Sequence, residues 1–110
     1  MTETVDVQGT VIGVGGLLAL VLILYGSFVS ETVFGLESMA AATWVFVGTF
    51  LAVAVVHGTY GRFDLALAHA GAGIGLAAVL LATSVIHVLG GLAILLVLGS
   101  YIAIVSIRAR

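Results

Sequence analysis

Residues 63–107, FDLALAHAGAGIGLAAVLLATSVIHVLGGLAILLVLGSYIAIVSI, are the stretch that decides the fold. A single helix of this length would extend roughly 67 Å at about 1.5 Å per residue, which is about twice the hydrocarbon thickness of a bilayer. The polar interruption between its two apolar halves is Thr83, Ser84 and His87. We therefore predict a tight turn near residues 84–87, with a membrane-spanning helix on each side of it.

Two further apolar runs precede this segment, and each has the length of about 20 residues that a membrane-spanning helix needs. These runs are apolar on all faces, whereas a membrane β-barrel would show short alternating segments. The predicted fold class is all-α: an integral membrane four-helix bundle with short loops, forming a single membrane domain over residues 1–110. The expected helices cover about 10–29, 38–56, 63–83 and 88–107.

The composition favours lipid as the main surrounding medium. Hydrophobic residues make up 63% of the chain and charged residues 7%, against roughly 45–50% and 25% in soluble domains. The chain lacks a basic patch, so no nucleic-acid partner is expected. It also has no cysteine, which excludes disulfides and thiol nucleophiles. No serine, histidine and carboxylate fall in one membrane plane, so we predict no catalytic residue and no enzyme activity.

The arginines predict the orientation of the chain. Four spans place the N-terminus, Arg62 and the C-terminal Arg108 and Arg110 on one side of the membrane, and Glu31 with Glu37 on the other. Basic residues concentrate on the cytoplasmic side of membrane proteins. We therefore expect a multi-pass protein of the cell membrane with both termini in the cytoplasm.

Small residues spaced four apart predict where helices approach one another, because helices associate in lipid through close packing. The third predicted helix is the richest in glycine and alanine, and we expect it to be the central packing helix. The same strips favour a homo-oligomer or a larger membrane-protein partner. The predicted helix-packing residues are Gly9 with Gly13, Gly48 with Ala52, Gly71 with Gly75, and Gly99 with Ala103.

An ionisable residue inside a membrane helix is a functional candidate, and His69 lies inside the third one. His57, Arg62 and Asp64 fall on the same side of the membrane. The favoured interpretation is structural, with His69 hydrogen-bonded to a neighbouring carbonyl or hydroxyl. A proton relay through this cluster is a weaker alternative, and His57 and His69 are weak candidates for cofactor binding. No metal site and no cofactor are predicted, because no helix carries the paired histidines of a metal motif.

The absence of lysine and cysteine, the many alanines, valines and glycines, and the acidic ends resemble the proteins of salt-loving archaea. This resemblance is compositional and implies no functional residue. The leading hypothesis is a non-enzymatic structural or accessory subunit that packs within the bilayer. One alternative is an oligomeric channel or transporter component, with a proton path lined by His69, Thr43, Thr49 and Ser100. Others are a membrane-embedded structural protein of an archaeal virus and a haem- or quinone-facing respiratory subunit.

Overall fold

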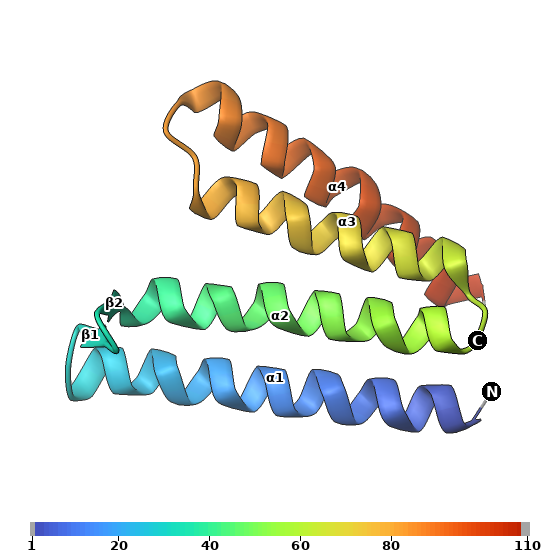
Figure 1. The fold of residues 1–110 in the computed structure, drawn as a ribbon, viewed down its shortest axis with the longest axis horizontal. Helices are drawn as coiled ribbons and strands as arrows, with labels where there is room; N and C mark the ends of the chain where they lie inside the picture. The colour runs from blue at the N-terminus through green and yellow to red at the C-terminus, as the bar shows by residue number, and fades with distance from the viewer. Residues whose placement is uncertain (1, 109–110) are drawn as a thin grey trace.

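The fold consists of four long helices and one small β-hairpin, and the computed structural model describes residues 2–108 (Figure 1). All four helices are long and apolar enough to cross a membrane. The predicted all-α four-helix bundle is thus confirmed. In chain order the elements are α1 (Thr2–Phe28), β1 (Thr32–Val33), β2 (Leu36–Glu37), α2 (Ser38–Thr59), α3 (Phe63–Leu80) and α4 (Val85–Arg108).

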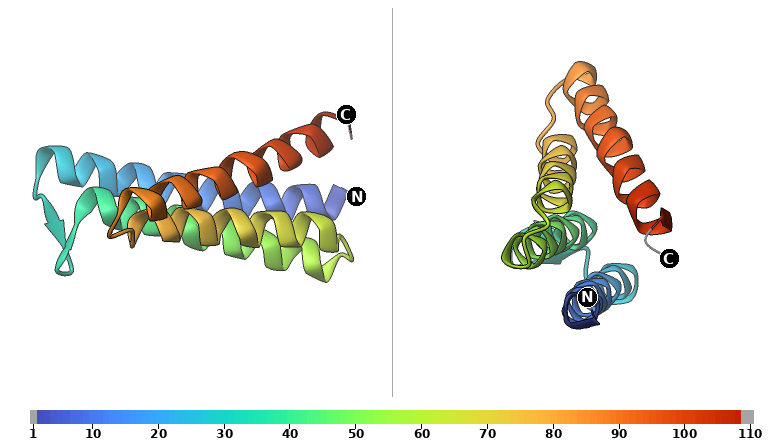
Figure 2. Two further views of the ribbon diagram at one scale, coloured as in Figure 1. Left: turned by 90° about the horizontal axis from the view of Figure 1, so that it is seen from above. Right: turned by 90° about the vertical axis from the view of Figure 1, so that its right-hand side faces the viewer.

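The helices pack in series. The principal contacts join α1 to α2, α2 to α3 and α3 to α4, so α2 and α3 are the inner helices and α1 and α4 the outer ones. The views in Figure 2 show α4 crossing α3 at an angle, with its C-terminal part diverging from the other helices. The beginning of α1, the α2–α3 turn and the end of α4 lie at one end of the molecule (Figure 1). The hairpin and the α3–α4 turn lie at the opposite end.

The first helix begins eight residues before the predicted start, at Thr2. Hydropathy marks the part of a helix that suits the bilayer, whereas polar residues such as Asp6 and Gln8 can continue the same helix beyond it. The hydroxyl of Thr10 donates to the carbonyl of Asp6 at 3.0 Å, which accommodates this polar side chain on the helix surface.

The α3–α4 turn lies a few residues earlier than predicted, because α3 ends at Leu80 and α4 begins at Val85. Ser84 starts the new helix: its hydroxyl accepts a hydrogen bond from the amide of His87 at 3.3 Å, and its carbonyl accepts one from Val88 at 3.2 Å. This is the arrangement of an N-terminal serine cap. The Ser84 cap therefore starts α4 directly after a turn that contains neither glycine nor proline.

A β-hairpin that the sequence analysis did not predict joins α1 to α2. Thr32 pairs with Glu37 across it, and the two residues at its tip, Phe34 and Gly35, have φ angles of 50° and 81°. Positive φ at both central residues is the pattern of a type I′ turn, which favours the right-handed twist of two paired strands. The Phe34 side chain at the tip is fully exposed.

The interior is built mainly from alanine and glycine. Buried apolar side chains larger than alanine are Val47, Val53 and Leu65. Small side chains let the backbones approach: a Cβ added to Gly91 of α4 would lie 2.7 Å from the Gly75 carbonyl oxygen of α3. Larger apolar side chains face outward along all four helices. The molecule thus has a thin core and an apolar exterior, which suits a lipid environment.

Candidate functional site at the end of α2 and α3

The turn between α2 and α3 brings two histidines together. The amide of Arg62 donates to the carbonyl of His57 at 2.9 Å, and Gly61 adopts a φ of 80°, which glycine tolerates without strain. The chain reverses within three residues. As a result, His57 in the last turn of α2 lies against His69 in the second turn of α3.

The two imidazole rings form a buried pair. His57 is 5% exposed and His69 is 6% exposed. Their ring centroids lie 5.0 Å apart, with 26° between the ring planes. The Phe50 ring is the second aromatic neighbour of His69, and the centroids of these two rings lie 6.3 Å apart. The pair is therefore shielded by apolar groups at the end of the helical hairpin.

Hydrogen bonding distinguishes the two rings. His69 Nδ1 lies 2.8 Å from the carbonyl oxygen of Leu65, one turn earlier in α3. A carbonyl oxygen only accepts, so Nδ1 carries the hydrogen and Nε2 of the neutral ring keeps its lone pair. Both ring nitrogens of His57 are buried without a hydrogen-bond partner. Leaving a buried polar group unpaired costs on the order of 1–3 kcal/mol.

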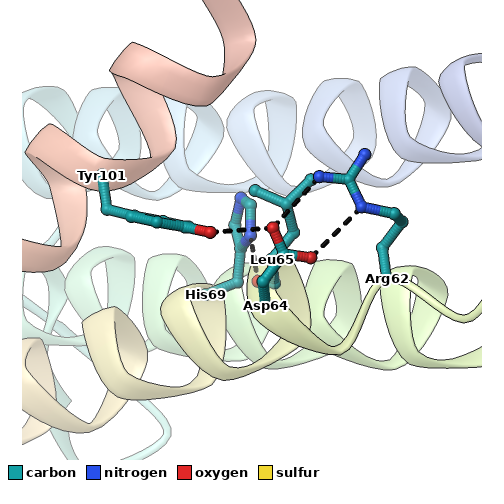
Figure 3. Close-up of polar contacts among 5 residues, drawn as sticks. All are labelled: Arg62, Asp64, Leu65, His69 and Tyr101. Carbon is teal, nitrogen blue, oxygen red and sulfur yellow. Dashed lines mark hydrogen bonds and ion pairs between the residues drawn. The ribbon is translucent and has the colours of Figure 1, made fainter.

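A second polar group lies beside His69, at the start of α3 (Figure 3). Two guanidinium nitrogens of Arg62 donate to the two carboxylate oxygens of Asp64, at 3.2 and 3.1 Å. Tyr101 of α4 donates its hydroxyl to Asp64 Oδ2 at 2.8 Å. The hydrogen bonds and negative charge of Asp64 raise the pKa of Arg62 above its usual range. Arginine stays protonated in proteins, so Arg62 carries its charge in this pair.

The third histidine lies at the opposite end of the molecule. His87 is exposed in the first turn of α4, where its Nδ1 lies 3.5 Å from the hydroxyl of Thr83. It has no part in the His57–His69 pair. This separation makes His87 a natural control for experiments on the other two histidines.

The geometry limits which cofactor the pair can hold. A haem with two axial histidines keeps their rings on opposite faces of the porphyrin, whereas rings with centroids 5.0 Å apart leave no room for a macrocycle. Within residues 2–108, no three histidine, cysteine, aspartate or glutamate side chains converge as metal ligands. The His57–His69 pair can therefore supply two nitrogen ligands from the described chain.

The hydroxyls of the hypothetical proton path do not extend the pair. Thr43 and Thr49 each donate to the carbonyl four residues earlier, at 3.0 and 2.8 Å. The side chain of Thr49 faces Gly15 of α1, whereas His69 lies between α3 and α2. Ser100 is exposed on α4. Within one chain, these side chains do not line a common path.

The predicted packing residues fall into two groups. Gly71 and Gly75 of α3 face Leu98 and Ile94 of α4. The other predicted glycines have open space beside them, because an added Cβ atom would meet no neighbouring atom within 4 Å. They are Gly9, Gly13, Gly48 and Gly99. Ala103 is exposed near Gly99, and Ala52 is partly exposed beside Gly48 along a groove between α1 and α2.

Several close approaches were missed by the sequence analysis. Gly15 faces Thr49, Gly26 faces Ser38, and Gly91 faces Gly75 and Val79. Each of these glycines contacts a residue of another helix. A four-residue spacing, in contrast, shows only which small residues share a face of one helix. The Tyr101–Asp64 hydrogen bond was also missed, since it joins residues 37 positions apart. Nothing local in the sequence indicates these pairs.

Comparison with protein-family models, curated proteins and solved structures finds no match to this chain.

Proposed function

We propose that the chain is a non-enzymatic structural or accessory subunit that packs within the bilayer, against copies of itself or against a larger membrane protein. The observation that carries this proposal is the outer surface of α1 and α4. Gly13, Gly99 and Ala103 are exposed there. The two glycines have room for an added side chain on the outside, so they are available to a partner helix.

The short connections between the helices support the same proposal. The described helices are joined only by residues 29–37, 60–62 and 81–84, so these connections offer little surface outside the helices. A partner would therefore be recognised chiefly inside the bilayer. There, small residues allow close backbone approach, and van der Waals packing stabilises the assembly.

Mass spectrometry of the intact assembly, released from a gentle detergent, tests this proposal. We expect a defined homo-oligomer or a stoichiometric complex with another membrane protein. A chain that is recovered only as a monomer would contradict the proposal. Gly71 and Gly75 are poor positions for perturbing the assembly, because they already contact α4 within the chain.

A matched pair of substitutions on α4 locates the contact. Gly99→Leu adds bulk to the strip shared with Ala103, and we expect it to dissociate the assembly. Ser100→Leu adds a leucine to the next exposed position, which points to another side of the helix. We expect that variant to keep the native mass. Equal effects of both substitutions would show that the Gly99 strip is not the interface.

The orientation of the protein forms part of the same proposal. Arg62 and Arg108 lie at the end of the molecule where α1 begins. Following the positive-inside tendency, we place this end in the cytoplasm and the β-hairpin on the opposite side of the cell membrane.

A further inference from the structure

We propose that His57 and His69 form a binding site for a divalent transition-metal ion such as Zn²⁺. This role goes beyond packing within the bilayer and is independent of it. The site would join the end of α2 to the start of α3. Neutral imidazole nitrogens are good ligands for zinc, copper and nickel.

His69 is already oriented as a metal ligand. Its Nδ1–H donates to the Leu65 carbonyl at 2.8 Å, which fixes the ring and directs the lone pair of Nε2 away from α3's own backbone. Histidines that ligate metals almost always donate their other ring N–H to a carboxylate, a carbonyl or water. The outer hydrogen bond that a metal site needs is therefore present.

His57 has unused binding capacity. It is 5% exposed, and neither ring nitrogen has a hydrogen-bond partner. An ion bound to one of these nitrogens would satisfy a buried lone pair that otherwise destabilises the fold. Its ring can turn about χ2, a broad torsion, without breaking a hydrogen bond.

The separation of the rings fits a shared ion. Zinc–nitrogen bonds of about 2.0–2.1 Å at a tetrahedral angle place two imidazole centroids roughly 5 Å apart. The observed separation is 5.0 Å. The rings are stacked, with 26° between their planes, so sharing an ion would require the His57 ring to turn about χ2 until one of its nitrogens faces the ion, while His69 keeps its hydrogen bond to Leu65.

The surroundings define the kind of site. No third ligand from residues 2–108 converges on the pair, so the remaining ligands of the ion would have to be water. Arg62 and Asp64 pair with each other nearby, and their opposite charges largely cancel at the ion. We therefore expect weaker binding than at a closed site with four protein ligands.

Binding of an ion accounts for the pair better than proton transport does. Beyond His69, residues 70–80 of α3 are alanine, glycine, leucine, isoleucine and valine only. None of these side chains can carry a proton. A path entering at the His57 end would stop at His69, whereas an ion bound there needs access from one membrane face only.

Equilibrium dialysis of the purified chain against Zn²⁺ tests the site. The protein is held in mild detergent with any polyhistidine tag removed, and a detergent blank is subtracted. We expect one saturable Zn²⁺ per chain. His57→Phe and His69→Phe keep a flat ring but remove its nitrogens. Loss of a residue that only hydrogen-bonds to a metal ligand weakens metal binding roughly 10- to 100-fold, so loss of a ligand itself should weaken Zn²⁺ binding by at least as much.

His87→Phe is the matched control, because His87 is exposed at the opposite end. This variant should bind Zn²⁺ as tightly as the native chain. Circular dichroism of each variant checks that the helices remain. If His57→Phe unfolds, the visible spectrum of the His87→Phe variant loaded with Co²⁺ still tests the site, because histidine ligation gives bands that aqueous Co²⁺ lacks.

Three results would overturn the proposal. They are no Zn²⁺ binding above the detergent blank, undiminished binding by a folded His57→Phe variant, and a loss in His87→Phe as large as in the other two variants. A Co²⁺ spectrum identical to that of the aqueous ion would overturn it as well.

Discussion

Tyr101 joins the C-terminal half of α4 to the start of α3 by a polar contact. Its hydroxyl donates to Asp64 at 2.8 Å, and Asp64 is held in turn by Arg62. An exposed ion pair contributes little to stability alone. The Tyr101–Asp64 hydrogen bond, however, joins α4 to the start of α3 across a separation of 37 residues.

The Tyr101→Phe substitution removes this hydroxyl and keeps the ring. We expect amide hydrogen exchange in the last two turns of α4 to become a few-fold faster, with exchange in α1 and α2 unchanged, because the change loosens one end of one helix. Tyr60→Phe, in the exposed α2–α3 turn, is the control and should leave α4 protected. Exchange in α4 that stays at the native rate would mean that packing alone positions this helix.

The residues also show what a single sequence can predict about a site. Helix spans put His57, Arg62, Asp64 and His69 on one side of the membrane, and the structure places them around the α2–α3 turn, at one end of the molecule. The contact between the two imidazoles depends on a three-residue turn and on how α2 and α3 are rotated. Hydropathy carries no information about rotation when a helix is apolar on all faces.

Among the elements, α3 and α4 make a close approach through glycine. A Cβ added to Gly91 would lie 2.7 Å from both the Gly75 carbonyl oxygen and Val79 Cγ2, whereas one added to the adjacent Gly90 would meet nothing within 4 Å. Two neighbouring glycines of one helix therefore differ in role. Gly91 sets the distance between the helices, and Gly90 does not.

This difference predicts opposite effects for the same substitution. Gly91→Ala should destabilise the protein by about 1–3 kcal/mol, because an inserted methyl group forces packed helices apart. Gly90→Ala should be neutral or stabilise it by up to about 1 kcal/mol, since alanine is the better helix former. Reversible unfolding in mixed detergent micelles measures both. A loss with Gly90→Ala equal to that with Gly91→Ala would show that this close approach does not matter.

At the level of elements, the sequence predicts the membrane spans better than their ends. The apolar runs locate all four helices, because about 20 apolar residues are needed to cross the hydrocarbon. The start of α1 and the α3–α4 turn differ from expectation, since the helix at Thr2 and the cap at Ser84 depend on backbone hydrogen bonding. The hairpin was missed because strands of two residues are too short for a periodic pattern.

The whole molecule combines a thin core of small residues with an apolar exterior. Water would penalise such a surface, whereas lipid tails do not. Because the helices pack in series, the outer helices α1 and α4 keep broad faces free for lipid or for another protein. Some small residues, such as Gly75 and Gly91, thus serve close packing between neighbouring helices, whereas others, such as Gly13 and Gly99, leave room for a partner.

The orientation of the molecule can be tested directly, because the chain has no cysteine and each introduced cysteine will be its sole thiol. Phe34→Cys places the thiol on the fully exposed hairpin tip, and Thr59→Cys places it in the last turn of α2 at the opposite end. In intact cells, we expect a membrane-impermeant maleimide to label residue 34 and not residue 59, because residue 59 lies at the arginine-bearing end of the molecule, which the positive-inside tendency puts in the cytoplasm. Both sites should react once the membrane is permeabilised, which controls for thiol access. Labelling of residue 59 alone from outside would reverse the orientation, whereas labelling of both in sealed cells would contradict the four-span arrangement across the membrane.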